Sequence, residues 1–104
     1  MKPSIGRIVH YTLGGPDAAM INTRRKNAAD HIGEHRDNAT GVVVHAGNTA
    51  REGDVYPLLI TRVWNTDPGT VNGQVLLDGN DSLWVTSTTP GEGPGRYAWP
   101  ERTA

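Results

Sequence analysis

Cysteine and phenylalanine are both absent from the 104 residues of this chain. Without cysteine the chain forms no disulfide, no thiolate zinc site and no cysteine nucleophile. Without phenylalanine, its core must be built from valine, isoleucine and leucine together with three tryptophans and three tyrosines. The polar tips of these aromatic residues suit a half-exposed binding face as well as a core.

Long apolar runs and an excess of one charge are also missing. No run approaches the roughly 20 residues of a membrane-spanning helix, and the first seven residues, MKPSIGR, lack the apolar segment of a secretory signal. We therefore expect a cytoplasmic protein without a membrane partner. Ten Lys and Arg stand against eleven Asp and Glu, for a formal net charge of −1. This balance argues against general nucleic-acid binding, which usually requires a basic excess.

The length and the spacing of turn residues predict one β-rich domain over residues 1–104. Alternating apolar positions bounded by Gly, Pro, Asn and Asp predict strands, and one stretch with helical spacing follows the first of them. We expect strands at 5–11, 42–45, 55–64, 71–77, 83–87 and 96–99, and a helix at about 16–32. The fold class is thus mainly β (α+β), a small SH3-like or curled barrel of five to six short strands with one inserted helix.

The expected helix carries a basic residue within its apolar stripe. Three-four spacing continued from Ile21 reaches Arg25, which is followed by Ala28. Either the methylene groups of Arg25 cover the core while its guanidinium reaches water, or the guanidinium points into a pocket for phosphate or carboxylate. Arg24 and Asn22 lie beside it on the same helix, so all three are candidate ligand-binding residues.

A second group of candidates combines arginine with tryptophan on the expected strands. Arg62 and Trp64 alternate onto one face with Leu58 and Ile60, and a buried face does not normally hold an unpaired arginine. Trp84 is opposite in phase to its neighbours on the last hairpin, and Trp99 shares a phase with Tyr97. Arginines beside indole rings suit a nucleobase with its phosphate or a protein-binding hot spot. The alternative is that these aromatic residues close the ends of the core.

A metal-protease pattern occurs at the end of the expected helix. His31, Glu34 and His35 match H-x-x-E-H, in which two histidines hold zinc and a glutamate activates water. Gly33 lies inside the pattern, where the helix should end, and the chain is short for a protease with a cleft. We therefore favour a solvated helix end over a catalytic zinc site.

The remaining polar residues give no catalytic or metal pattern. His10 and His45 lie on expected strands without a Ser, Asp or Glu at triad spacing, and are more typical of structural or face-lining histidines. Asp78, Asn80 and Asp81 resemble part of a calcium loop but lack the further acidic ligand, so a hairpin turn explains them better. We expect no metal, no cofactor and no catalysis.

Three segments together resemble a known group of proteins. The opening PSIGRIVHY (3–11), the ITRVW segment (60–64) and the ending GEGPGRYAWPE (91–101) resemble small proteins of tailed bacteriophages and prophages. The segment INTRR (21–25) resembles longer members from phages of actinobacteria. The resemblance implies a small protein in the cytoplasm of an infected bacterial host cell. It further implies that the protein either sequesters a host molecule, such as a nucleotide immune signal or a defence protein, or forms part of the virion.

These observations favour a non-catalytic phage binding protein. The leading hypothesis is an anti-defence sponge for a nucleotide-derived signal, in which Arg24 and Arg25 meet phosphate and Asn22 orients it. The stacking residues would be Trp64, Trp84 or Trp99, with Arg62 nearby. The alternative is a virion or host-protein interaction module that uses the same aromatic residues. Because 104 residues enclose a small ligand poorly, we expect a homo-oligomer.

Overall fold

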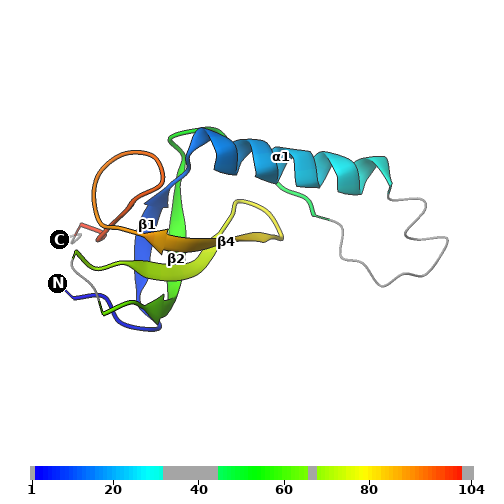
Figure 1. The fold of residues 1–104 in the computed structure, drawn as a ribbon. Helices are drawn as coiled ribbons and strands as arrows, with labels where there is room; N and C mark the ends of the chain where they lie inside the picture. The colour runs from blue at the N-terminus through cyan, green and yellow to red at the C-terminus, as the bar shows by residue number, and fades with distance from the viewer. Residues whose placement is uncertain (1, 32–44, 66–67, 102–104) are drawn as a thin grey trace.

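A computed structural model describes residues 2–31, 45–65 and 68–101 of the chain. Five antiparallel strands form one sheet, and a single helix follows the first strand (Figure 1). The elements are β1 (Ile8–Thr12), α1 (Gly15–Asp30), β2 (Val55–Val63), β3 (Val71–Leu76), β4 (Ser82–Thr88) and β5 (Tyr97–Ala98). The mainly β fold with one inserted helix, expected from the sequence, is confirmed.

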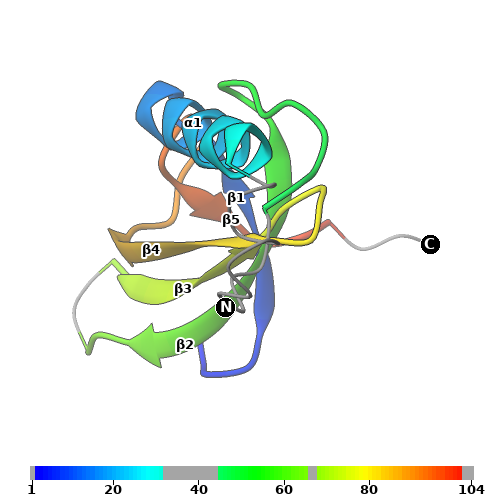
Figure 2. The ribbon, with the colours of Figure 1, turned by 90° about the vertical axis from the view of Figure 1, so that its right-hand side faces the viewer.

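The sheet order is β4-β3-β2-β1-β5, so the last strand returns to the first. The chain just after β4 also bridges to β5, because Pro90 pairs with Tyr97 and the Tyr97 amide donates to the Thr89 carbonyl at 3.2 Å. The sheet therefore curls until its two ends approach each other, as Figure 2 shows with α1 lying across the top. Register shifts between Ile60 and Arg62 and between Val71 and Gly73 contribute to this curvature, because bulges bend and twist strands.

The core occupies the inside of the curled sheet. On β1 and in the first part of β4, buried and exposed residues alternate, as the period of two predicts, whereas three successive residues are buried at the start of β3. Helix α1 adds Ala18 and Ile21 to this interior. The buried side chains with under 2% exposure include Val9, Leu13, Ile21, Leu58, Ile60, Val71, Val75 and Tyr97.

The helix starts where the sequence predicts it, with Pro16 in its first turn. Asp17 Oδ2 accepts the Gly14 amide at 2.9 Å and the Tyr11 hydroxyl at 2.7 Å. This carboxylate therefore satisfies a free donor at the helix start and ties β1 to α1. It also lies at the positive end of the helix dipole, which stabilises it further.

Three boundaries differ from the sequence-based expectation. The first strand begins at Ile8 and not at residue 5, because a turn precedes it. In this turn the Arg7 amide donates to the Ser4 carbonyl, and Gly6 has a φ of 90°. The helix ends at Asp30, and the closing strand is only two residues long. Of the strand expected at 42–45, residues 42–44 lie outside the described residues, and His45 belongs to no strand.

Candidate functional site

Arg25, the basic residue in the apolar stripe, is buried in an ion pair. Its side chain is 9% exposed, and that of its partner Asp81 is 1% exposed. Arg25 Nη2 and Nε donate to the two carboxylate oxygens at 2.9 and 3.1 Å, and Nη1 donates to the Asn48 carbonyl. A forked guanidinium matched to a carboxylate in this way is a strong, geometrically specific contact. Of the two alternatives that the sequence left open for Arg25, neither describes this contact fully, because the guanidinium is buried against the protein's own carboxylate.

Two further helix residues predicted as ligands make similar internal contacts. Arg24 Nη2 donates to the Ser82 carbonyl at 2.9 Å and lies 3.4 Å from Asp81 Oδ2. The Asn22 amide group makes a two-way pair with the Ala50 backbone, donating at 2.8 Å and accepting at 3.0 Å. We call this set, Asn22, Arg24, Arg25, Asn48, Ala50 and Asp81, the helix clasp. It joins α1 to the segment before β2 and to the turn between β3 and β4, and is no phosphate cradle.

The charges of the clasp reinforce each other. Burial alone would favour the neutral form of the Asp81 carboxyl, but the hydrogen bond and charge of Arg25, followed by Arg24, outweigh it and lower its pKa. The Asp81 hydrogen bond in turn raises the pKa of Arg25 against the effect of burial. Both groups are therefore charged in the native state at neutral pH.

Arg62 and Trp64 lie at the other end of the β3–β4 hairpin from the clasp. Arg62 is opposite Asn72 near the start of β3, whereas Leu76 and Ser82, at the clasp end, are opposite each other. The sequence placed Arg62 and Trp64 on the face of Leu58 and Ile60, and this is wrong. The register shift after Ile60 inserts one residue, so the side chains beyond it change face and become exposed.

Trp64 is held in a fixed position on the outer side of the sheet. The Arg62 guanidinium lies 3.9 Å from its ring centroid, and its indole N–H donates to Asn72 Oδ1 at 3.0 Å. Asn72 is 8% exposed, and the same Oδ1 accepts the Ser87 amide at 2.8 Å. The indole is thus oriented in advance by a cation on one side and a buried amide on the other.

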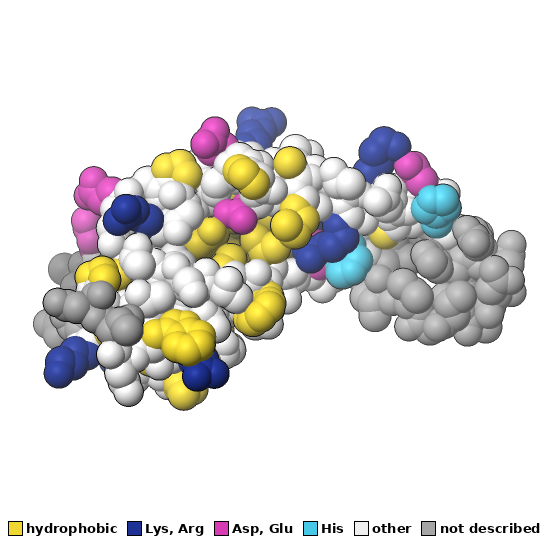
Figure 3. Space-filling model, viewed as in Figure 1, with side chains coloured by type: hydrophobic (Ala, Val, Ile, Leu, Met, Phe, Trp, Pro, Cys, Tyr) yellow, Lys and Arg dark blue, Asp and Glu magenta, His cyan; other side chains and the backbone are white. Residues whose placement is uncertain are grey.

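Apolar side chains continue across the same side of the sheet. Pairing places Trp84 opposite Gln74, Gln74 opposite Leu59, and Leu59 opposite Ile8, so the row crosses four strands. Trp84 is 62% exposed, Ile8 51% and Leu76 44%. In the view of Figure 3, hydrophobic side chains emerge at several places over the sheet with Lys and Arg side chains beside them. We call Ile8, Leu59, Leu76 and Trp84 the outer face.

Trp99, the third candidate indole, is separate from the other two. It follows β5, which meets the chain beyond the end of β4 at Pro90, whereas Trp84 lies near the start of β4. The ring is partly buried against the core, and the Arg7 guanidinium lies 5.3 Å from its centroid. The structure therefore brings together Arg62 with Trp64, and both with the outer face. It does not bring the three arginines of the helix and β2, or the three indoles, to one site.

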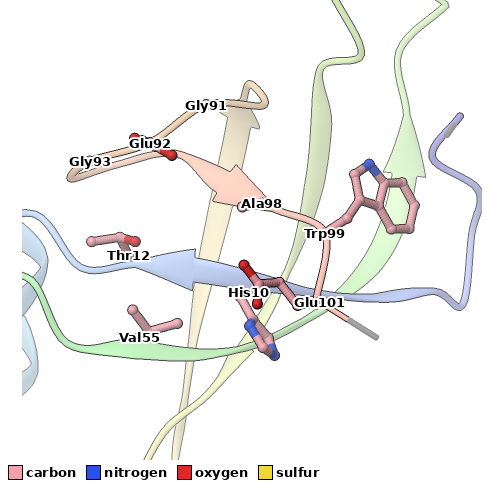
Figure 4. Close-up of a pocket in the computed structure, with 9 residues that line it drawn as sticks. All are labelled: His10, Thr12, Val55, Gly91, Glu92, Gly93, Ala98, Trp99 and Glu101. Atoms are coloured by element: carbon pink, nitrogen blue, oxygen red, sulfur yellow. The ribbon is translucent and has the colours of Figure 1, made fainter. Parts of the chain in front are cut away.

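An open pocket of about 500 Å³ lies beside β1 and β5 (Figure 4). It is lined by His10, Thr12, Val55, Gly91, Glu92, Gly93, Ala98, Trp99 and Glu101. The Trp99 indole points away from His10 in Figure 4, so the walls are mainly strand residues and the loop after β4. Sequence reasoning identified His10 as a possible face-lining residue but missed Glu92, which lies in a glycine-rich loop, and Glu101, which follows Pro100.

Other expected sites are only partly covered by the structure. Glu34 and His35 of the H-x-x-E-H pattern lie outside the described residues. Among the residues that are described, no group of three or more His, Asp or Glu side chains is arranged to hold a metal ion. The single described helix is too short and too polar to cross a membrane.

Comparison with known proteins adds no relative. No family model, no curated protein and no solved structure matches the chain.

Proposed function

We propose that this chain is a non-catalytic binding module whose partner is another protein, contacted through the outer face and the adjacent Arg62–Trp64 pair. The observation that carries the proposal is Trp84, which projects from β4, where this edge strand pairs regularly with β3, with 62% of its surface exposed. Tryptophan and arginine are the residues most enriched at protein-binding hot spots. Apolar neighbours such as Leu76 and Ile8 extend the contact area beyond a single side chain.

A rigid position makes these side chains better binding groups. Trp64 is already oriented by Arg62 and Asn72, so little side-chain freedom is lost when a partner covers it. The backbone under Trp84 is fixed by pairing with Gln74. Both indoles therefore offer large contact areas at low entropic cost, which favours a protein surface as the partner.

The biological setting belongs to the same proposal. The likeness of the opening and the ending to small tailed-phage proteins supports a role during phage infection. Binding a host defence protein or a neighbouring virion protein would both use the outer face. Analysis of purified particles by mass spectrometry separates these two settings.

Nucleotide sequestration, the leading hypothesis from the sequence, keeps part of its support. Arg62, Trp64 and Trp84 are exposed and could contact a base and a phosphate. The phosphate-binding role of Asn22, Arg24 and Arg25 loses support, because the Asn22 amide, one Arg24 Nη and the Arg25 guanidinium donate within the helix clasp. We therefore rank sequestration below protein binding.

The proposal is tested by selecting binders from a random peptide library displayed on the surface of a carrier phage. Peptides selected on the wild-type protein should bind the Trp84→Ser variant at least tenfold more weakly. The matched control is Met20→Ser, which removes a side chain of similar exposure (55%) from α1. Peptides that bind the Trp84→Ser variant as well as the wild type would contradict the proposal. Calorimetry with cyclic nucleotides is the second arm, and submillimolar binding there would favour sequestration instead.

A further inference from the structure

The pocket of Figure 4 is continuous with the outer face. His10 and Thr12 on β1 belong to the same strand phase as Ile8, and Val55 on β2 belongs to that of Leu59. His10 is opposite both Pro57 and Ala98, so the pocket floor is the outer side of the sheet where β2, β1 and β5 adjoin. The loop that carries Glu92, and Glu101 after β5, form the rims. A polypeptide that covers the outer face therefore reaches this pocket without leaving the sheet.

The acidic and basic side chains of the pocket lining are of one sign. Glu92 and Glu101 are acidic, and none of the nine lining residues is Lys or Arg. Two cations lie next to the lining: Arg96 lies against Gly91 and reaches the Pro90 carbonyl at 3.5 Å, and the Arg7 guanidinium lies 5.3 Å from the Trp99 ring centroid. Neither arginine is a lining residue, so the charged side chains of the lining itself favour a cation over phosphate.

The shape indicates which kind of cation fits. His10, Glu92 and Glu101 are not arranged as a metal-holding group within the described residues. Val55 and Ala98 supply apolar surface to the same lining as the two carboxylates, which suits the methylene groups of a long basic side chain. A volume of about 500 Å³ holds such a side chain together with part of its backbone.

We propose that this pocket receives a lysine or arginine side chain of the partner protein, a proposal that rests on protein binding as the function of the chain. The stem lies against Val55 and Ala98, and the charged head is placed between Glu92 and Glu101. The outer face then provides contact area, and the pocket selects a partner that carries a basic residue beside an apolar one. Opposite charges set apart from the aromatic contacts increase specificity and the rate of association.

The test uses two small probes that differ in charge and hardly in shape. N-acetyl-argininamide and its neutral isostere N-acetyl-citrullinamide are titrated separately into the wild-type protein, and amide chemical shifts are followed by NMR. We expect saturable shifts at Gly91, Gly93 and Ala98 with the arginine probe, and at least fivefold weaker binding of the citrulline probe. Binding of the arginine probe should weaken as salt is added, because these carboxylates are exposed.

Matched variants locate the effect. Glu92→Gln combined with Glu101→Gln should weaken the arginine probe at least fivefold, whereas Glu52→Gln, an exposed glutamate near the start of α1, should leave it unchanged. Equal binding of the two probes, or no effect of the double variant, would overturn the pocket proposal. The Trp84→Ser variant should still bind the arginine probe. Failure of the Trp84-dependent peptide selection would therefore refute protein binding through the outer face separately from the pocket chemistry.

Discussion

Replacing Asp81 with asparagine should destabilise the fold more than any other isosteric change in the clasp. The carboxylate is 1% exposed and accepts from Arg25 at 2.9 and 3.1 Å and from Arg24 at 3.4 Å. An asparagine can accept at only one atom, and its amide nitrogen turns a donor toward a guanidinium donor. The variant therefore leaves Arg25 as a buried cation without its counter-charge.

The size of the effect follows from these contacts. A hydrogen bond to a charged group contributes about 1.5–3 kcal/mol, and one of the two short ones is lost outright. The buried charge adds a desolvation cost, which the partly exposed Arg24 and nearby solvent reduce. We expect a loss of about 2–3 kcal/mol in the free energy of unfolding, or roughly 10–20 °C in Tm for a domain of this size.

Chemical denaturation at several pH values is the appropriate assay. Because the native pKa of Asp81 is lowered, its contribution is fully present above its ordinary pKa of about 3.9 and is lost as the pH falls through the lower native value. The stability difference between the wild type and Asp81→Asn should therefore be constant near neutrality and should shrink below about pH 4.

A paired replacement separates lost charge from lost packing. Changing Arg25 to methionine and Asp81 to leucine together removes both charges and keeps apolar volume, so it should cost less than Asp81→Asn alone. A loss below about 0.5 kcal/mol for Asp81→Asn, the range of ordinary surface substitutions, would refute the buried clasp. So would a stability difference that does not change with pH.

Three other perturbations test the stability of the fold. Tyr97→Phe should cost about 1–2 kcal/mol in denaturant unfolding, because the hydroxyl of this 1% exposed side chain donates to the Gly69 carbonyl. Gly73→Ala should cost about 2–4 kcal/mol, since a methyl group there would lie 2.5 Å from Leu58 Cδ2 and closer still to the Leu59 carbonyl oxygen. All three tyrosines have raised pKa values, chiefly through burial, so stability should fall as the pH rises above about 10. Tyrosinate absorbance should then appear together with unfolding, and its full appearance in the native state would contradict this.

The strands and the buried phase of the sheet follow from alternation in the sequence. Leu83 and Val85 are buried while Trp84 is exposed, as the period of two predicts. Arg62 and Trp64 depart from this alternation of buried and exposed residues because of the register shift after Ile60. A bulge depends on how two strands pair over many residues, so local alternation cannot reveal it.

The candidate sites were less predictable than the fold for a related reason. Helical spacing singled out Arg25, but its partner Asp81 is 56 positions away and reads locally as a turn residue. The sequence therefore could not decide between a ligand pocket and an internal ion pair. The decision depends on the position of the β3–β4 turn, which carries Asp81, beside α1. The pocket carboxylates Glu92 and Glu101 line the same pocket as His10 because a two-residue strand, β5, returns to β1. Such short pairings leave almost no periodic signal.

Arg25 and Arg62 perform different tasks, and the difference follows from how deeply each is buried. Arg25 is enclosed with a carboxylate and stabilises the attachment of α1, whereas Arg62 covers an exposed indole at the opposite end of the hairpin. Trp84→Ser should therefore leave unfolding within about 0.5 kcal/mol of the wild type while abolishing peptide binding. Asp81→Asn should lower the free energy of unfolding but should leave peptide binding unchanged at temperatures where the variant is folded. If both variants lost binding in proportion to their loss of stability, the outer face would be a consequence of the fold and not a binding surface.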